Sequence, residues 1–150
     1  MVRIAIALAA IPLVLLAACG TGASSDAPKD WRPLPGASDA WSNGSRSSAQ
    51  EYRYTRKPFE GGLPELASVV TIDALLRHRG AKSTGNAPFS ACPGLAGVAS
   101  FRLPDGEILQ EGFTVRNGVS VRISYLRPAG SPVDSNAAAA MQTALCSRPG

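Results

Sequence analysis

The stretch Leu95–Arg127, LAGVASFRLPDGEILQEGFTVRNGVSVRISYLR, decides the fold of this 150-residue chain. Apolar and polar residues alternate through it, as is typical of half-buried β-strands. Three such runs are present: Leu95–Leu103, Glu107–Val115 and Val119–Arg127. Two turn sequences connect them, Pro104-Asp105-Gly106 and Arg116-Asn117-Gly118. Short turns between alternating runs predict an antiparallel β-meander.

The turn residues predict how these strands pair. A three-residue loop at 104–106 places Gly106 in the left-handed region and pairs Phe101 with Leu109. At the second turn, a two-residue Asn-Gly loop would mix apolar and polar residues on one face, so we expect a three-residue loop that pairs Val115 with Val119. The strands then share one apolar face: Leu95, Ala99, Phe101, Leu103, Leu109, Phe113, Val115, Val119, Val121, Ile123 and Tyr125.

The flanking sequence predicts further elements. Gln50–Lys57 alternates like a strand, and a helix is expected from Leu63 to about Arg79, where basic residues and Gly80 follow. Its expected apolar side is Leu63, Leu66, Val69, Val70 and Leu76. An edge strand is expected near 88–91, and a second helix after Asp134. Together these elements predict an α+β fold, with an antiparallel three- to five-stranded sheet and two helices packed on one face.

The N-terminus has the pattern of a secretory signal peptide. Arg3 is the only charge before Asp26, and residues 4–18 are apolar throughout. About 15 apolar residues are few for a helix that must cross ~30 Å of hydrocarbon. We therefore expect a cleaved signal rather than a permanent membrane span.

Leu16-Ala17-Ala18-Cys19 resembles the lipobox of bacterial lipoproteins. The resemblance implies cleavage before Cys19, diacylglycerol on the Cys19 sulfur and acylation of the new amino group, commonly by palmitate. Gly20 stands where Asp would retain many Gram-negative lipoproteins at the inner membrane. In a Gram-negative cell the expected location is therefore the outer membrane, facing the periplasm. The alternative is an ordinary signal peptide that happens to contain a cysteine.

Once Cys19 is assigned to the lipid, Cys92 and Cys146 remain as an even pair. An oxidising compartment favours a disulfide between them. The expected organisation is a signal peptide at 1–18, a lipid-anchored flexible tether at 19–49 and a single domain at 50–147. Trp31 and Trp41 are unusual in a pure linker and are expected to dock on the domain, contact lipid headgroups or bind a partner.

The order of elements over about residues 50–146 resembles that of PsbP/Mog1-like domains. The resemblance is one of topology and is not carried by any diagnostic residue. It implies the α+β architecture and licenses no function.

Two sets of charged residues are candidate binding residues. Glu111 is expected to project onto the apolar face, opposite Ala99 and Ile123, where a carboxylate must be paired or protonated. It is either a functional acid, a residue turned outward by a bulge at Gly112, or a carboxylate neutralised by an arginine. The expected polar face carries Arg102, Arg116 and Arg122, which form either a basic binding patch, together with basic residues of Gln50–Lys57, or an ordinary solvated face.

The remaining composition narrows the function classes. The chain has one histidine, no Gly-x-Ser-x-Gly motif and no phosphate-binding glycine loop, so we predict no catalytic residues, metal or cofactor. A net charge of +4 on an exported chain does not indicate nucleic-acid binding. The expected function is a non-catalytic envelope lipoprotein that binds a partner protein or an envelope polymer. The alternatives are a small-ligand carrier or sensor with a cavity between sheet and helices, and a small carboxylate-based enzyme.

Overall fold

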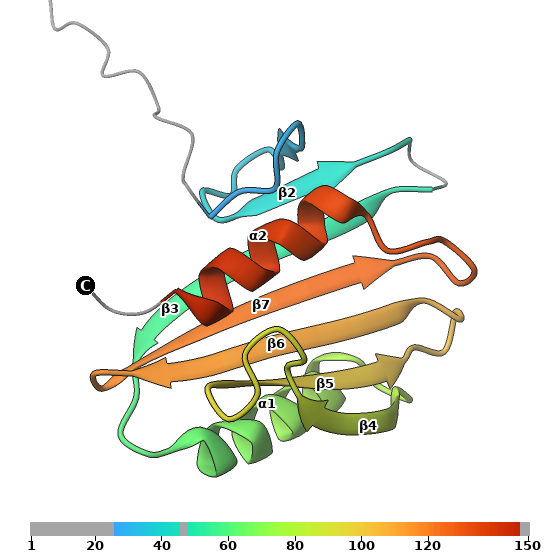
Figure 1. Ribbon diagram of the computed structural model, residues 1–150. Helices are drawn as coiled ribbons and strands as arrows, with labels where there is room; N and C mark the ends of the chain where they lie inside the picture. Colours follow the sequence, from blue (N-terminus) through green and yellow to red (C-terminus); the bar gives the residue numbers. More distant parts are fainter. Residues whose placement is uncertain (1–25, 46–47, 148–150) are drawn as a thin grey trace, which may run out of the picture.

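Seven strands form one antiparallel sheet, and two helices pack against it (Figure 1). The structure is a computed structural model that describes residues 26–45 and 48–147. The signal sequence and Cys19 lie outside the described residues. The strand order is β1-β2-β3-β7-β6-β5-β4. The elements are β1 (Arg32–Pro33), β2 (Ala40–Asn43), β3 (Gln50–Pro58), α1 (Leu63–Arg77), β4 (Lys82–Pro88), β5 (Ala96–Arg102), β6 (Ile108–Arg116), β7 (Val119–Arg127) and α2 (Ser135–Cys146).

The α+β class, the antiparallel sheet, the two helices and the disulfide are confirmed, but the sheet is larger than the three to five strands expected. The two additional strands are β1 and β2, which extend one edge of the sheet. β1 has only two residues, and every residue of β4, the strand at the other edge, is exposed. Such strands carry no alternating apolar pattern, so their sequences resemble loops. For the same reason the edge strand lies at Lys82–Pro88 rather than near 88–91.

The first turn of the meander has the predicted geometry. Phe101 pairs with Leu109, and Leu103 N–H donates to the Glu107 carbonyl oxygen at 2.9 Å across the three-residue loop. Gly106 has a φ of 91°, in the left-handed region that favours glycine. The pairing of β5 with β6 is therefore confirmed.

The second turn differs from the prediction by one residue. Arg116 pairs with Val119, and Val115 pairs with Ser120, so the loop contains only Asn117 and Gly118. Both loop residues have positive φ, 50° and 72°. This is the combination that a two-residue type I′ hairpin requires, and Asn-Gly is its preferred sequence. The expected three-residue loop was therefore wrong.

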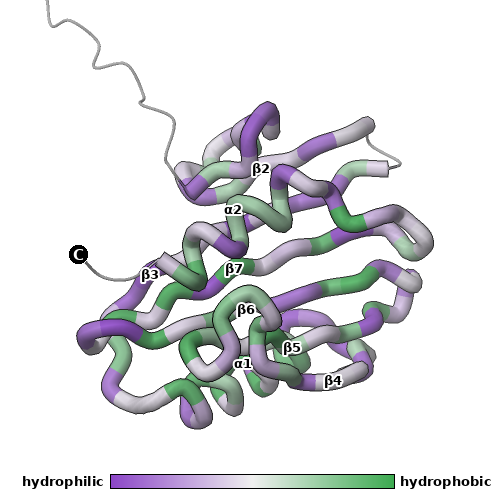
Figure 2. The backbone as a smooth tube through the Cα atoms, viewed as in Figure 1, coloured by the Kyte–Doolittle hydropathy of each residue, from purple (hydrophilic) through white to green (hydrophobic). Residues whose placement is uncertain are grey.

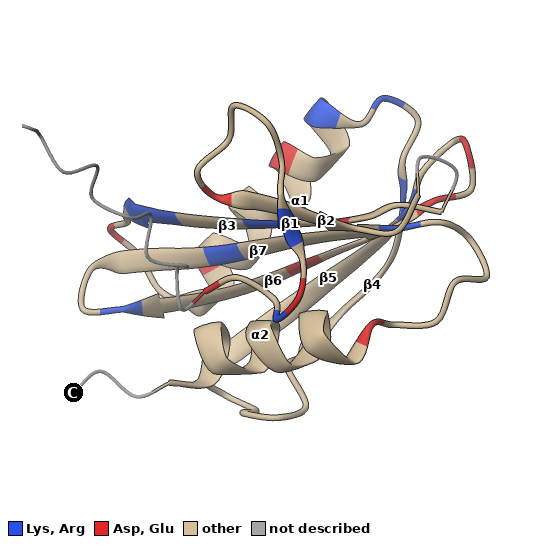
Figure 3. Ribbon diagram, turned by 90° about the horizontal axis from the view of Figure 1, so that it is seen from above, with Lys and Arg blue, Asp and Glu red and all other residues tan. Residues whose placement is uncertain are grey.

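This shift moves the apolar residues of β7 to the other face of the sheet. Successive residues of a strand point to opposite faces. Phe113 contacts the cluster beneath α1, whereas a Cβ at the neighbouring Gly112 would lie 2.7 Å from Leu145 of α2. The helices consequently cover opposite faces, as Figure 3 shows, and the expectation that both pack on one face was wrong. The physical reason is that both faces of the sheet carry apolar side chains, so each face must be buried beneath a helix.

Two apolar cores result, one under each helix, and apolar positions recur along the central strands and around α1 (Figure 2). The core under α1 includes Leu66, Val70, Ala74, Phe101, Leu109 and Phe113. The core under α2 includes Tyr52, Val121, Ile123, Tyr125, Met141 and Leu145. Glycine is needed at position 112 because α2 approaches the β6 backbone too closely for a side chain there.

The segment before residue 50 belongs to the domain. Trp31 and Trp41 are buried in the core under α2, and β1 and β2 extend the sheet. The Trp31 indole N–H donates to Asp134 Oδ1 at 3.2 Å, and its ring contacts Tyr52 edge-on at 6.3 Å between centroids. The expected start of the domain at residue 50 was therefore too late. Two buried aromatic rings supply enough apolar area to hold this polar segment on the sheet.

The disulfide fixes the end of α2. Cys92 and Cys146 are joined, with their Cα atoms 5.7 Å apart, as the cysteine count predicted. At the other end of α2, the Asp134 side chain accepts hydrogen bonds from the backbone N–H groups of Asn136 and Ala137, which caps the helix. Within residues 26–45 and 48–147, neither helix has the length and apolarity that crossing a bilayer requires.

Candidate functional site

Glu111 is completely buried between β6 and α1. It lies opposite Ala99 on β5, as predicted, but opposite Ser124 rather than Ile123 on β7, because the second turn is one residue shorter. The strand pairing on both sides of Glu111 is regular, so no bulge at Gly112 turns the carboxylate outward. A carboxylate in this position requires compensation by positive charge and hydrogen bonds.

That compensation comes from a network of four charges beneath the C-terminal half of α1. Arg77 Nη2 donates to Glu111 Oε1 at 2.8 Å, and Ser124 Oγ donates to the same oxygen at 2.7 Å. Arg122 Nη2 lies 3.8 Å from Glu111 Oε2. Asp73 Oδ2 accepts from Arg122 at 2.8 Å and from Arg77 at 3.2 Å. Two arginines and two carboxylates therefore balance each other.

The electrostatics of Asp73 favour its ionised form. Partial burial by itself raises the pKa of Asp73. The hydrogen bond from Arg122, with the positive charges of Arg77 and Arg122, outweighs burial and holds the pKa below its usual range. Both acids are thus bridged by arginines. A proton-transfer group needs access to a substrate, whereas Glu111 has no exposed surface. The geometry matches a carboxylate neutralised by arginine that holds α1 on the sheet.

The three candidate arginines do not form one patch. Arg122 faces α1, inside the charge network. Arg102 and Arg116 lie on the opposite face of the sheet and at opposite ends, since Arg102 pairs with Ile108 and Arg116 precedes the Asn117-Gly118 turn. The expectation that they share a polar face depended on the three-residue loop, and it was wrong for the same reason.

The outward side of α1 is apolar. Val69, Ile72, Leu75 and Leu76 are 46%, 58%, 40% and 76% exposed, respectively. Val69 and Leu76 had been expected on the buried side, but the buried positions are Leu66, Val70 and Ala74, which recur every four residues. α1 therefore carries large apolar side chains on its exposed side as well as on its buried side, beside the polar residues Glu65 and Ser68. The sequence contained this signal, because α1 has more large apolar residues than one helix face can hold.

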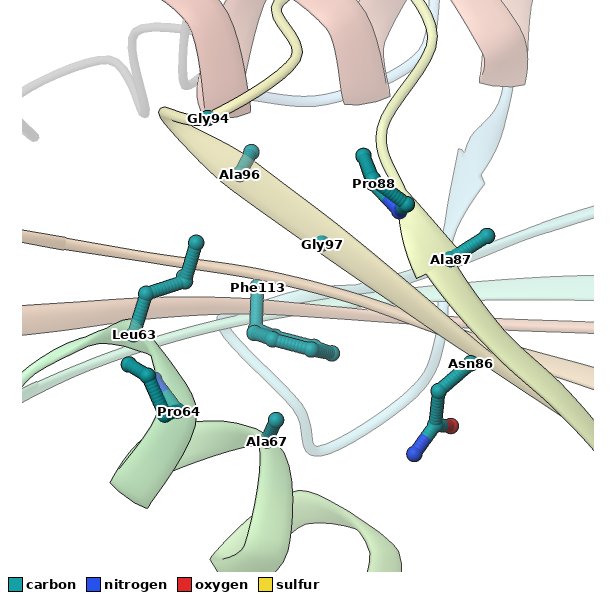
Figure 4. A pocket seen from close by; sticks show the side chains of 10 residues that line it. All are labelled: Leu63, Pro64, Ala67, Asn86, Ala87, Pro88, Gly94, Ala96, Gly97 and Phe113. Carbon is teal, nitrogen blue, oxygen red and sulfur yellow. The ribbon is translucent and has the colours of Figure 1, made fainter.

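An apolar groove lies beside the first turns of α1, between this helix and β4 and β5 (Figure 4). Its volume is about 280 Å³. The Phe113 ring forms part of its wall and lies against Gly97, where a Cβ would be 2.6 Å from the ring. Asn86 is the polar side chain among the lining residues, and it donates to Thr71 Oγ1 at 3.4 Å.

Comparison with known proteins found no family model and no curated protein that matches the chain. In the described part of the chain, no group of three or more His, Cys, Asp or Glu side chains is arranged to hold a metal ion.

Proposed function

We propose that the protein is a non-catalytic envelope lipoprotein, anchored in the membrane through lipidated Cys19, and that it binds a partner protein through the outward face of α1. In a Gram-negative cell this places the domain on the outer membrane, facing the periplasm. The observation that carries the proposal is the row of exposed side chains Val69, Ile72, Leu75 and Leu76, which we call the α1 apolar face.

The physical support is that this face is both apolar and fixed in position. A large aliphatic side chain contributes roughly 1.5–3 kcal/mol when it is fully buried. Contiguous exposed apolar side chains on a monomer are typical of interaction sites. Arg77 holds the helix on the sheet through Glu111 of β6, and Asp73 does so through Arg122 of β7, so the face is presented without a disorder-to-order cost.

The charges around the face indicate the chemistry of the partner. Arg79 and Lys82 follow the α1 apolar face, whereas Glu65 precedes it, and all three are exposed. A complementary partner has an apolar surface with acidic side chains at the end that meets Arg79 and Lys82. An apolar face offers few hydrogen-bonding groups to an envelope polysaccharide, so a protein is favoured over a polymer.

Site-specific photocrosslinking in intact cells tests the proposal. A photoreactive residue at Ile72 is expected to give one discrete adduct, and the same residue at the exposed Ala139 of α2 none. The crosslinked protein is then purified, and its affinity is measured against the acylated full-length chain. Leu76→Glu should weaken binding at least ~10-fold, because a charge replaces a central apolar contact.

Ala139→Glu introduces the same charge on the opposite helix and should leave the affinity unchanged. Equal labelling from Ile72 and Ala139, or a purified partner that binds Leu76→Glu as tightly as wild type, would contradict a binding role for the α1 apolar face.

A further inference from the structure

A cavity of about 380 Å³ lies at the end of the sheet, apart from α1. It is formed where β3 ends, β6 turns into β7 and α2 ends, three places that lie together in Figure 1. Asp26, the first described residue, also lines it. The cavity is therefore located where the chain enters the domain from its N-terminal side.

The cavity is cationic and rich in hydrogen-bond donors. Arg56 and Arg116 line it from β3 and β6, on either side of β7. Arg116 Nη2 is buried and has no hydrogen-bond partner among the described residues. Burial lowers the pKa of Arg116, while Tyr54 acts to raise it. The other polar residues of the lining are Tyr54, Asn117, Thr143 and Ser147, and Asp26 contributes one carboxylate.

Two guanidinium groups beside hydroxyl donors suit an anion with several oxygen atoms. Guanidinium binds phosphate in a bidentate manner and in a fixed orientation. A phosphate in the cavity would balance the two guanidinium charges of Arg56 and Arg116 and would outweigh the single carboxylate of Asp26.

The length of the N-terminal chain brings this cavity to the membrane. Only the six residues 20–25 separate the expected acylation site, Cys19, from Asp26. The seven Cα–Cα steps from Cys19 to Asp26 span at most about 25 Å even when fully extended. An acylated Cys19 therefore keeps the cavity within reach of the lipid headgroups, where anionic phosphates are concentrated.

We propose that the Arg56–Arg116 cavity binds the phosphate of an anionic phospholipid in the membrane that holds the acyl anchor. This inference rests on the proposed anchorage at Cys19. It orients the domain with this end of the sheet on the membrane. The α1 apolar face lies on the opposite side of the sheet from the cavity and stays accessible to a partner (Figure 3).

Hydrogen–deuterium exchange of the acylated full-length protein in nanodiscs tests the inference. The discs contain phosphatidylcholine alone or phosphatidylcholine with phosphatidylglycerol. Amides of residues 54–57 and 116–119 should exchange about 10-fold more slowly in the anionic discs, as one charge-assisted hydrogen bond would give. Arg56→Gln/Arg116→Gln should abolish the difference. Lys82→Gln/Arg102→Gln removes the same charge from an exposed pair at the far edge of the sheet. This control should preserve the difference in exchange between the two kinds of disc.

Each of the other possible outcomes overturns a specific part of this inference. Equal exchange in both discs, or an equal loss in the two double variants, overturns specific headgroup binding. The same protection in phosphatidylcholine discs after addition of inorganic phosphate overturns the lipid as the ligand and assigns the cavity to free phosphate. Protein that carries no acyl group overturns the anchorage and this inference together, whereas acylated protein without protection overturns this inference alone.

Discussion

Replacing Arg77 with methionine is expected to lower the free energy of unfolding by about 3 kcal/mol. The substitution keeps most of the apolar length of the side chain and removes the nearest positive charge from Glu111, which has no exposed surface. Removing one partner of a buried ion pair leaves an uncompensated charge, and this typically costs roughly 3–5 kcal/mol. The lower end of this range applies because Arg77 is itself 42% exposed and because Arg122 remains near the Glu111 carboxylate.

Equilibrium unfolding in urea measures this effect, with Arg79→Met as the matched control. Arg79 is exposed two residues further along the chain, and its loss should change stability by less than about 0.5 kcal/mol. Glu111→Gln should destabilise less than Arg77→Met, because glutamine keeps an acceptor for Arg77 and Ser124 without a buried charge. If Arg77→Met and Arg79→Met have the same stability, the network does not hold α1 on the sheet.

Removing the disulfide with Cys92→Ser/Cys146→Ser is expected to cost roughly 3–4.5 kcal/mol of stability. The bond links residues 54 positions apart, and closing such a loop strongly restricts the unfolded chain. It also joins the β4–β5 connection to the end of α2, so its loss should loosen the core beneath that helix. Wild-type protein in reductant should unfold at the same denaturant concentration as the double variant.

Cys19→Ser provides the comparison for this experiment, because Cys19 takes no part in the disulfide. In detergent, its unfolding midpoint should match that of the wild type and should fall on addition of reductant. A double variant that is as stable as the wild type would show that the two cores suffice without the covalent link.

Local signals in the sequence predicted several elements correctly. Pro104 and Gly106 fix the first turn, Asp134 marks the start of α2, and the even pair Cys92 and Cys146 gives the disulfide. The turn and the helix start depend on residues that act locally, and the disulfide follows from the number of cysteines. Such signals do not require knowledge of the opposite face of the sheet.

The errors came from interactions between distant parts of the chain. The Asn117-Gly118 turn was predicted one residue too long because a single apolar face was assumed, whereas α2 provides a second face for Val121 and Ile123. Glu111 and Arg77 are 34 residues apart in sequence, and only the packing of α1 brings them together. Buried tryptophans likewise extended the domain beyond its expected boundary at residue 50.

The most direct test of membrane anchorage is the intact mass of the native protein from membrane fractions, measured with and without reductant. The mature chain is expected to begin at acylated Cys19 and to gain two hydrogen atoms when the disulfide is reduced. A soluble chain that carries no acyl group would contradict the anchorage on which both the proposed function and the headgroup site depend.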